Sequence, residues 1–324
     1  MKTTAATLGT EPPVTAESAR ESLKRHGKSF HLAGKFLPPK TTERCARLYR
    51  FCRFLDDLSD ESADSKLASQ QLAQIEQDLL EKSRRHPAVA DFLDLAEECG
   101  FETDPAVELV RGVRGDLSEV AFETEAELKQ YAYRVAGTVG LLMCGVMGVT
   151  DPAAFRHAID LGVAMQLTNI ARDVREDAQN GRRYLPAAFL EQTPSIGVIA
   201  ENHPESHGQI RKGVRRLLEE ADLYYISGIA GIAYLPFRAR LGILIAARLY
   251  QSIGTEIRRM DFAVWKGRAK VSLLQKLFIS GYTLVVFFRR WALASKPSGH
   301  DLTLHRDLKG FPGAHQQTGG ASGR

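Results

Sequence analysis

The chain has 324 residues, of which 44% are hydrophobic and 25% are charged, and its formal net charge at pH 7 is +4. This composition excludes collagen-like and intrinsically disordered chains and allows a sizeable buried core. Because the basic residues form no long tail, nucleic-acid binding is not expected. The charge suits an anionic small substrate or an anionic membrane surface better.

The two ends of the chain differ in composition from its middle. Residues 1–15 and 295–324 are rich in Gly, Pro, Ser, Thr and His, so we predict disordered tails there and one folded domain over residues 16–294. The N-terminus lacks the apolar segment of a secretory signal, and no stretch reaches the roughly 18 apolar residues of a membrane-spanning helix. A cytoplasmic protein is therefore expected.

Helical spacing of apolar residues recurs through the domain, and no alternating strand pattern interrupts it. The chain is therefore predicted to be all-α, with eight or more helices in a single bundle. Proline and turn residues mark the expected breaks. These breaks lie at Pro38-Pro39, His86-Pro87, Thr103 to Pro105, Thr150 to Pro152 and residues 194–208.

The helix predicted after Pro39 carries carboxylates on its inward face. Its apolar stripe passes from Tyr49 to Cys52 and continues, in steps of four, to Asp56 and Asp60. An unpaired buried carboxylate is costly. A cation is therefore expected beside this stripe.

A second predicted helix repeats the pattern. Gln166, Asn169, Asp173 and Asp177 follow one another with the same steps of three, four and four. Residues four apart on a helix lie about 5–6 Å apart, close enough for two carboxylates to share a cation, and Asp57 can join from the flank. Oxygen donors without a nearby His or Cys favour Mg²⁺ or Mn²⁺, and a few carboxylates around Mg²⁺ suit a polyphosphate ligand.

Several motifs resemble those of the squalene/phytoene synthases, over residues 22–290. They are the segments YRFCRFLDD with Asp60, QLTNIARDVRED, GRRYLP and YAYRVAGTVG. The resemblance implies an isoprenoid synthase helical bundle around a central cavity, with catalysis in the domain over residues 16–294. It also implies that the protein is a prenyltransferase acting on isoprenoid diphosphates.

The resemblance also assigns roles to individual residues. The expected metal ligands are Asp56, Asp60, Asn169, Asp173 and Asp177, with Asp57 on the flank. The expected phosphate contacts are Arg53 and Arg172, and the expected chamber residues are Tyr49, Tyr131, Val135 and Gln166. Further substrate contacts are expected at His26, Ser29, Phe30, Tyr250, Arg268 and Lys276.

Small residues over 135–140 leave two interpretations open. Glycine weakens a helix interior by about 1 kcal/mol, so its presence indicates a close approach. The neighbour is either an isoprenoid tail in an apolar tunnel or another helix.

The resemblance implies a head-to-head condensation through a cyclopropyl diphosphate, most similar to that of bacterial phytoene synthases. The expected substrate is geranylgeranyl diphosphate and the expected product phytoene, in carotenoid biosynthesis, without NADPH. The alternative is farnesyl diphosphate, giving squalene, dehydrosqualene or presqualene diphosphate. A non-catalytic assembly factor with the same fold is a remote alternative, because all the aspartates are present.

The segment from Leu273 to Trp291 is apolar and ends in two arginines. It is interpreted either as a core helix or as a surface that contacts a membrane, because basic and aromatic residues next to an apolar helix suit lipid headgroups. Oligomeric state is left open.

Overall fold

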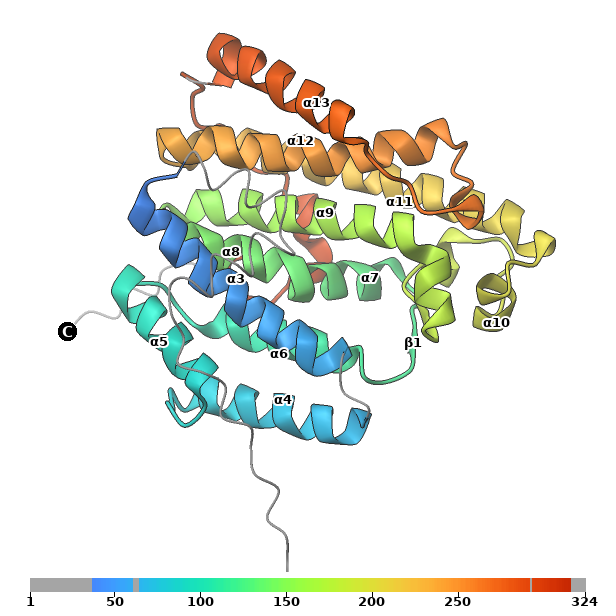
Figure 1. The fold of residues 1–324 in the computed structure, drawn as a ribbon, viewed down its shortest axis with the longest axis horizontal. Coiled ribbons are helices and arrows are strands. Elements are labelled where there is room, and N and C mark those ends of the chain that lie inside the picture. Colours follow the sequence, from blue (N-terminus) through green and yellow to red (C-terminus); the bar gives the residue numbers. More distant parts are fainter. Residues whose placement is uncertain (1–36, 61–63, 292, 316–324) are drawn as a thin grey trace, which may run out of the picture.

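The computed structural model describes residues 37–60, 64–291 and 293–315. These residues fold into one bundle of α-helices, as predicted (Figure 1). The α-helices are α3 (Pro39–Asp60), α4 (Ser65–Leu80), α5 (Pro87–Cys99), α6 (Asp104–Gly115), α7 (Glu125–Ala132), α8 (Thr138–Val146), α9 (Pro152–Gln179), α10 (Ile196–Ala200), α11 (Pro204–Ala230), α12 (Phe237–Arg259) and α13 (Leu273–Val286). The π-helical segments are η1 (Tyr133–Gly137) and η5 (Phe287–Trp291), and the 3-10 segments are η2 (Ala187–Phe189), η3 (Gly231–Tyr234), η4 (Val264–Lys266) and η6 (Leu302–Leu308).

The helices α3, α5, α6, α9 and α11 begin at predicted breaks, because proline fits the first turn of a helix. α9 begins after Asp151, whose side chain accepts a hydrogen bond from the Ala153 amide at 3.1 Å. The stretch 194–208 is not one loop. It contains the short helix α10 and the first turn of α11.

The longest helix, α9, runs through the middle of the bundle (Figure 1). One apolar core joins it to α11 and α12, and a second core joins α3 to α4, α5 and α6. Two short strands, β1 (Val120–Ala121) and β2 (Arg182–Arg183), pair in parallel beside the C-terminal end of α9. This pairing fixes the chain where it leaves α9.

Glycines allow α9 to approach η1 and α8 closely. A Cβ on Gly162 would lie 2.3 Å from the Ala136 carbonyl oxygen, and one on Gly140 would lie 2.2 Å from that of Ala158. The helix-packing interpretation of residues 135–140 therefore holds. The other interpretation is also supported, because Gly140 and Gly162 line an apolar cavity.

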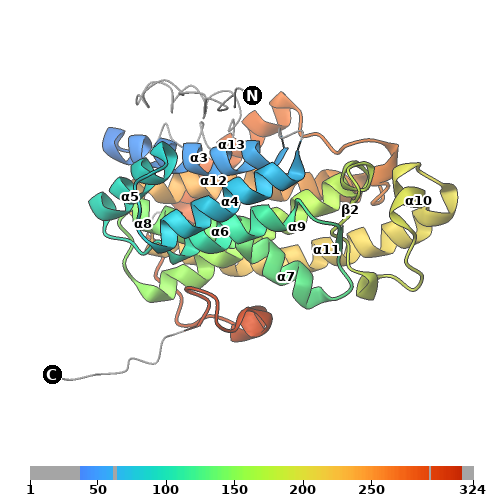
Figure 2. The same ribbon diagram turned by 90° about the horizontal axis from the view of Figure 1, so that it is seen from below.

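The C-terminal segment departs from the expected disordered tail. Residues 296–315 pack against the bundle, and the side chains of Leu304, Leu308 and Ala314 are buried. Figure 2 shows this segment on the face of the bundle opposite α3 and α13. Composition misled the prediction, because a few buried apolar side chains and hydrogen bonds of histidines and backbone carbonyls are enough to hold the segment.

The helix α13 lies on the outside of the bundle against α12 (Figure 1). Only Thr283 of its residues is buried, so the core-helix interpretation is wrong. Within the described ranges, none of the helices is long and apolar enough to cross a membrane.

The glycine contact predicts a stability effect. Gly162→Ala should lower the free energy of unfolding by about 1–3 kcal/mol, because the added methyl group overpacks the contact with η1. Gly208→Ala is the matched control on α11, since its Cβ would meet nothing within 4 Å; it should be neutral or stabilising. Urea denaturation followed by circular dichroism measures both. Equal stability of the two variants would contradict the packing described.

Candidate active site

Two adjoining pockets lie between α3, η1 and α9. The first is polar, with a volume of about 320 Å³. The second is mainly apolar, with a volume of about 330 Å³. Both are lined by Asp56, Val135, Gln166 and Asn169. The polar pocket therefore adjoins the apolar one.

The predicted stripes of α3 and α9 face these pockets. The polar pocket is lined by Asp56 and Asp60 of α3 and by Asn169, Asp173 and Asp177 of α9. Helical periodicity explains the convergence, because positions three and four apart share a face. Five of the six predicted metal ligands thus surround one pocket. The sixth, Asp57, is not among the lining residues and forms an ion pair with Arg53 one turn earlier.

The pocket carboxylates are electrostatically strained by burial and by one another. Burial, with the nearby Asp60 carboxylate, raises the pKa of Asp56 to about 7. Burial, with the nearby Asp173 carboxylate, raises the pKa of Asp177 to about 7. Both effects disfavour the charged form. A divalent cation among these oxygens would relieve the strain.

Two arginines contact the Asp173 carboxylate directly. The Arg172 guanidinium donates to both of its carboxylate oxygens, at 2.8 and 2.5 Å. Arg268 contacts the same carboxylate from the loop before α13, at 2.9 and 3.0 Å. Its Nη1 also lies 3.3 Å from Glu176. Two predicted phosphate or substrate contacts are therefore at the pocket's edge, where both can form bidentate bonds with phosphate oxygens.

The other predicted substrate contacts divide into three groups. Tyr49 and Tyr250 line the apolar cavity, and Tyr131 lines the polar pocket. Lys276 lies on α13 and is not among the described residues that line either pocket. Three positions, His26, Ser29 and Phe30, lie outside the described residues.

The residues that line the polar pocket but were not predicted from the sequence include Asp116, Arg182 and Tyr184. Asp116 accepts hydrogen bonds from the Tyr131 hydroxyl at 2.9 Å and the Tyr184 hydroxyl at 2.6 Å. The two tyrosine rings stack with their centroids 4.7 Å apart. Asp116 does not belong to either predicted carboxylate stripe, so no local sequence pattern marked it as a site residue. Arg182 and Tyr184 stand in the GRRYLP motif, which was the available signal.

The apolar cavity extends from the carboxylates along α9. Its walls carry small residues at the helix contacts, among them Ala136, Gly140, Ala158 and Gly228. Its far end is lined by Ala154 and His157 in the first turns of α9. The arrangement places a carboxylate-lined polar site beside a deep apolar space for a hydrocarbon chain.

The comparisons with known proteins agree with this architecture. The model of the family described as "Squalene/phytoene synthase" matches residues 23–275. The chain belongs to the squalene/phytoene synthase family. The resemblance inferred from the motifs is confirmed.

Individual members of the squalene/phytoene synthase family align over most of the chain. The 15-cis-phytoene synthase of Pantoea ananas is 35% identical over 302 residues, covering 89% of this chain and 95% of that protein. The 15-cis-phytoene synthase of Enterobacter agglomerans is 36% identical over 263 residues, covering 77% and 88%. The crystal structure of a dehydrosqualene synthase in complex with ligand matches with a TM-score of 0.73, 25% identity and coverage of 85% and 96%.

The residues of the polar pocket fit a divalent metal ion. The fit rests on the all-oxygen donor set and on the raised pKa values of Asp56 and Asp177, which show excess negative charge at the point where the two helices face each other. Mg²⁺ commonly combines a few carboxylates with substrate phosphates.

The raised pKa values predict a pH dependence of stability. Without divalent metal, the folded protein keeps protons on Asp56 and Asp177 up to about pH 7, whereas an unfolded Asp loses its proton near pH 4. The folded state binds more protons between these values, so the contribution of both groups to stability is present at low pH and is lost as pH rises through 7. Asp56→Asn stays neutral and avoids this loss.

The measurement is the melting temperature from pH 5 to pH 8 in EDTA. As pH rises, the melting temperature of Asp56→Asn should increase relative to that of wild type. The corresponding difference in the free energy of unfolding is on the order of a few kcal/mol. Asp94→Asn, at an exposed carboxylate of α5, is the control and should keep the wild-type slope. If Asp56→Asn also keeps that slope, the strained carboxylate pocket is contradicted.

Proposed function

We propose that the protein is a phytoene synthase that joins two molecules of geranylgeranyl diphosphate head to head. The names and coverage of the bacterial relatives support this substrate. The main observation in support of the proposal is that a carboxylate pocket adjoins a deep apolar cavity. This is the form required by a substrate with a diphosphate head and a long hydrocarbon tail.

The carboxylates are proposed to hold Mg²⁺ or Mn²⁺ around the diphosphates. When bound, the metal supplies positive charge that stabilises departing diphosphate. Arg172, Arg182 and Arg268 are proposed to bind phosphate oxygens from the pocket's edge. Arg53 and Lys276, which are not among the residues lining either pocket, are proposed as further phosphate contacts. Binding at Arg172 and Arg268 would exchange their bonds to Asp173 for bonds to phosphate.

The apolar cavity is proposed to protect the cationic carbon chain. Loss of diphosphate from the first substrate leaves an allylic cation, which the double bond of the second attacks; loss of a proton then closes the cyclopropane. Departure of the second diphosphate, rearrangement and loss of another proton give phytoene. Tyr49 and Tyr250, which line the cavity, are proposed to stabilise positive charge with their rings, and the apolar walls exclude water.

The final step distinguishes this reaction from its reductive relative. Proton loss needs no hydride donor, so activity without NADPH is expected. The main alternative is farnesyl diphosphate as substrate. The structural similarity to a dehydrosqualene synthase supports this alternative. The convergence of all the predicted metal-binding aspartates except Asp57 on one pocket favours an enzyme over a non-catalytic assembly factor.

The test is incubation of the purified protein with Mg²⁺ and either geranylgeranyl or farnesyl diphosphate, with and without NADPH, followed by mass analysis. We expect phytoene from the longer substrate, in equal amounts with and without NADPH. Asp56→Asn should lower turnover by at least about a hundredfold, since it removes charge stabilisation at the site of ionisation. A hydrocarbon formed only with NADPH, or only from farnesyl diphosphate, would contradict the assignment.

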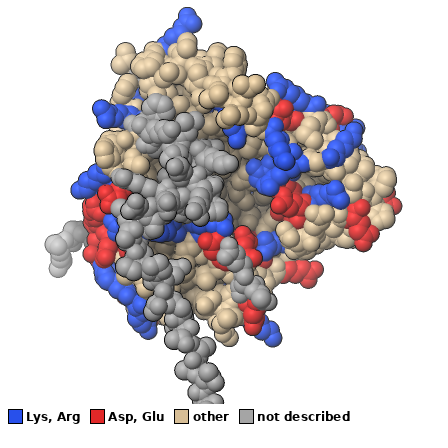
Figure 3. All heavy atoms as spheres, in the orientation of Figure 1, with Lys and Arg blue, Asp and Glu red and all other residues tan. Residues whose placement is uncertain are grey.

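We further propose that α13 rests on an anionic membrane surface, where an insoluble product can leave. Large apolar side chains of this helix and of η5 are exposed: Leu273, Leu274, Leu277, Phe278, Tyr282, Val285 and Phe288. Figure 3 shows a largely uncharged surface over α13 at the top of the view. Arg289 and Arg290 follow the helix directly, which suits contact with anionic headgroups. A cytoplasmic, peripheral location is expected.

Sedimentation with liposomes containing anionic lipid tests this surface. Arg289→Glu with Arg290→Glu should weaken binding severalfold, because each basic residue near such a surface contributes about 1 kcal/mol. Arg306→Glu with Lys309→Glu makes the same change in net charge on the opposite face (Figure 2) and should leave binding unchanged. Binding that both pairs alter equally, or that neither alters, would contradict the proposal. Self-association through α13 without lipid binding would assign the surface to a second copy of the chain.

A further inference from the structure

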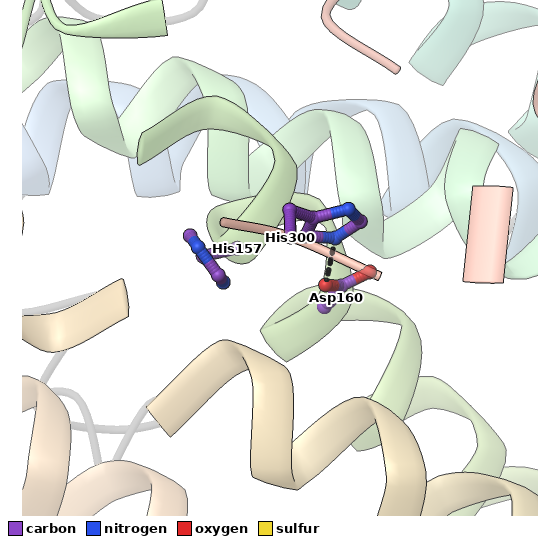
Figure 4. A group of neighbouring side chains, drawn as sticks. All are labelled: His157, Asp160 and His300. Atoms are coloured by element: carbon purple, nitrogen blue, oxygen red, sulfur yellow. Dashed lines mark hydrogen bonds and ion pairs between the residues drawn. The ribbon is translucent and has the colours of Figure 1, made fainter. Parts of the chain in front are cut away.

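A buried cluster of charged side chains lies on the side of α9 away from the carboxylate pocket. Asp160 of α9 is its centre (Figure 4). Its Oδ2 accepts hydrogen bonds from His300 Nε2 at 2.6 Å and from the Ser227 hydroxyl at 2.5 Å, and its Oδ1 lies 2.8 Å from His305 Nε2. The side chains of Asp160, His300 and His305 are at most 1% exposed. A cluster so completely buried must be paired internally to be tolerated.

Hydrogen bonds hold both Asp160 and His305 in place. Burial alone would raise the pKa of Asp160, but hydrogen bonds from His300 and His305 hold it below its usual value. His305 Nδ1 lies 2.8 Å from the Ala314 carbonyl oxygen, which can only accept. His305 is therefore held at both ring nitrogens, between the Asp160 carboxylate and the Ala314 carbonyl group.

The distances favour hydrogen bonding over a metal centre. His157, Asp160 and His300 bring potential ligand atoms within 4.8 Å of one another. Two ligands about 2.0 Å from one tetrahedral zinc lie about 3.3 Å apart. The contacts of Asp160 at 2.6 and 2.8 Å are shorter than this and have the length of charge-assisted hydrogen bonds.

The cluster fastens the C-terminal segment, residues 296–315, to the bundle. Side chains of the bundle also bind backbone carbonyls of this segment: the hydroxyls of Tyr224 and Tyr133 donate to Leu304 and Pro312, each at 2.7 Å. At its start, Lys296 pairs with Asp151 at 2.9 Å. The segment therefore crosses from the N-terminus of α9 to η1.

The same segment lies directly behind the deep end of the apolar cavity. His157 lines the cavity, and its ring meets the His300 ring edge-on, with centroids 5.1 Å apart. Its Nδ1 is bound to the Ser227 carbonyl oxygen at 2.9 Å, next to the hydroxyl that donates to Asp160. Tyr133 belongs to η1, which contributes Val135 and Ala136 to the cavity wall.

We propose that residues 296–315 form the outer support of the deep end of the cavity, and that Asp160 is the positioning residue that fastens this support and, through it, the His157 ring. This inference rests on the proposed function, because it takes an isoprenoid tail as the occupant of the cavity. The support determines how well the last part of a long tail is held.

The distance along α9 from Asp173 to His157, compared with the lengths of the two substrate tails, shows which substrate should depend on this support. His157 and Asp173 are sixteen residues apart, which is about 24 Å at 1.5 Å per residue. An extended chain advances roughly 1.2 Å per bond, so a geranylgeranyl tail reaches about 19 Å from its oxygen and a farnesyl tail about 14 Å. With the diphosphate added, only the longer tail reaches the level of His157.

The experiment compares kcat/KM for geranylgeranyl and farnesyl diphosphate in full-length Asp160→Asn and in His300→Ala with His305→Ala. Each variant should lose about tenfold or more with the longer substrate, because apolar contacts to its last unit are lost. The loss with the shorter substrate should be less than about threefold. Amide hydrogen exchange should increase over residues 297–315 and 154–162. Arg306→Ala, exposed on the same segment, is the matched control and should behave as wild type.

Several results would overturn the inference. Equal losses with both substrates would indicate a purely structural role, and unchanged exchange over residues 154–162 would separate the segment from the cavity. Stoichiometric zinc in the purified protein would replace the hydrogen-bonded cluster with a metal site. If Asp160→Asn does not fold, Ser227→Ala, which removes one of three hydrogen bonds, is measured in its place. A wild-type protein without activity on geranylgeranyl diphosphate contradicts the proposed function; the exchange measurement still tests the support.

Discussion

Burial of carboxylates on two facing helices, each beside a second carboxylate of its own helix, is the constraint on which the site depends. Burial and neighbouring charge raise the pKa of Asp56 and Asp177 to about 7, so the fold holds these groups where they are least stable as anions. The rigid positions of α3 and α9 impose this strain, and the apolar cores behind the two helices stabilise the arrangement. A divalent cation would relieve this strain, and in the proposed function the same cation also binds the diphosphate.

The apolar cavity depends on a second constraint, the close contact of α9 with η1 and α8. Gly140 and Gly162 remove the side chains that would separate these helices, while Ala136 and Ala158 leave room beside them. The cavity is therefore a consequence of helix packing through small residues. π-Helical segments are often found at functional sites, and η1 turns Val135 toward both pockets.

Local patterns predicted the helices and the two carboxylate stripes, because periodicity determines which side chains share a face. They could not predict Asp116, whose place in the pocket depends on tyrosines of α7 and of the segment after β2. The C-terminal segment was misjudged for a similar reason. Its attachment depends on Asp160, about 140 residues earlier in the chain, and no local composition reveals such a pairing.

The central claim is that the two helices bind metal together with diphosphate. The most direct test is anomalous diffraction from crystals grown with Mn²⁺ and an unreactive thiolodiphosphate analogue of geranylgeranyl diphosphate. Manganese peaks should lie between the carboxylates of α3 and α9, within about 2.2 Å of oxygen atoms, with the tail of the analogue in the cavity lined by His157. Peaks absent from this pocket, or found only at the Asp160 cluster, would contradict the account.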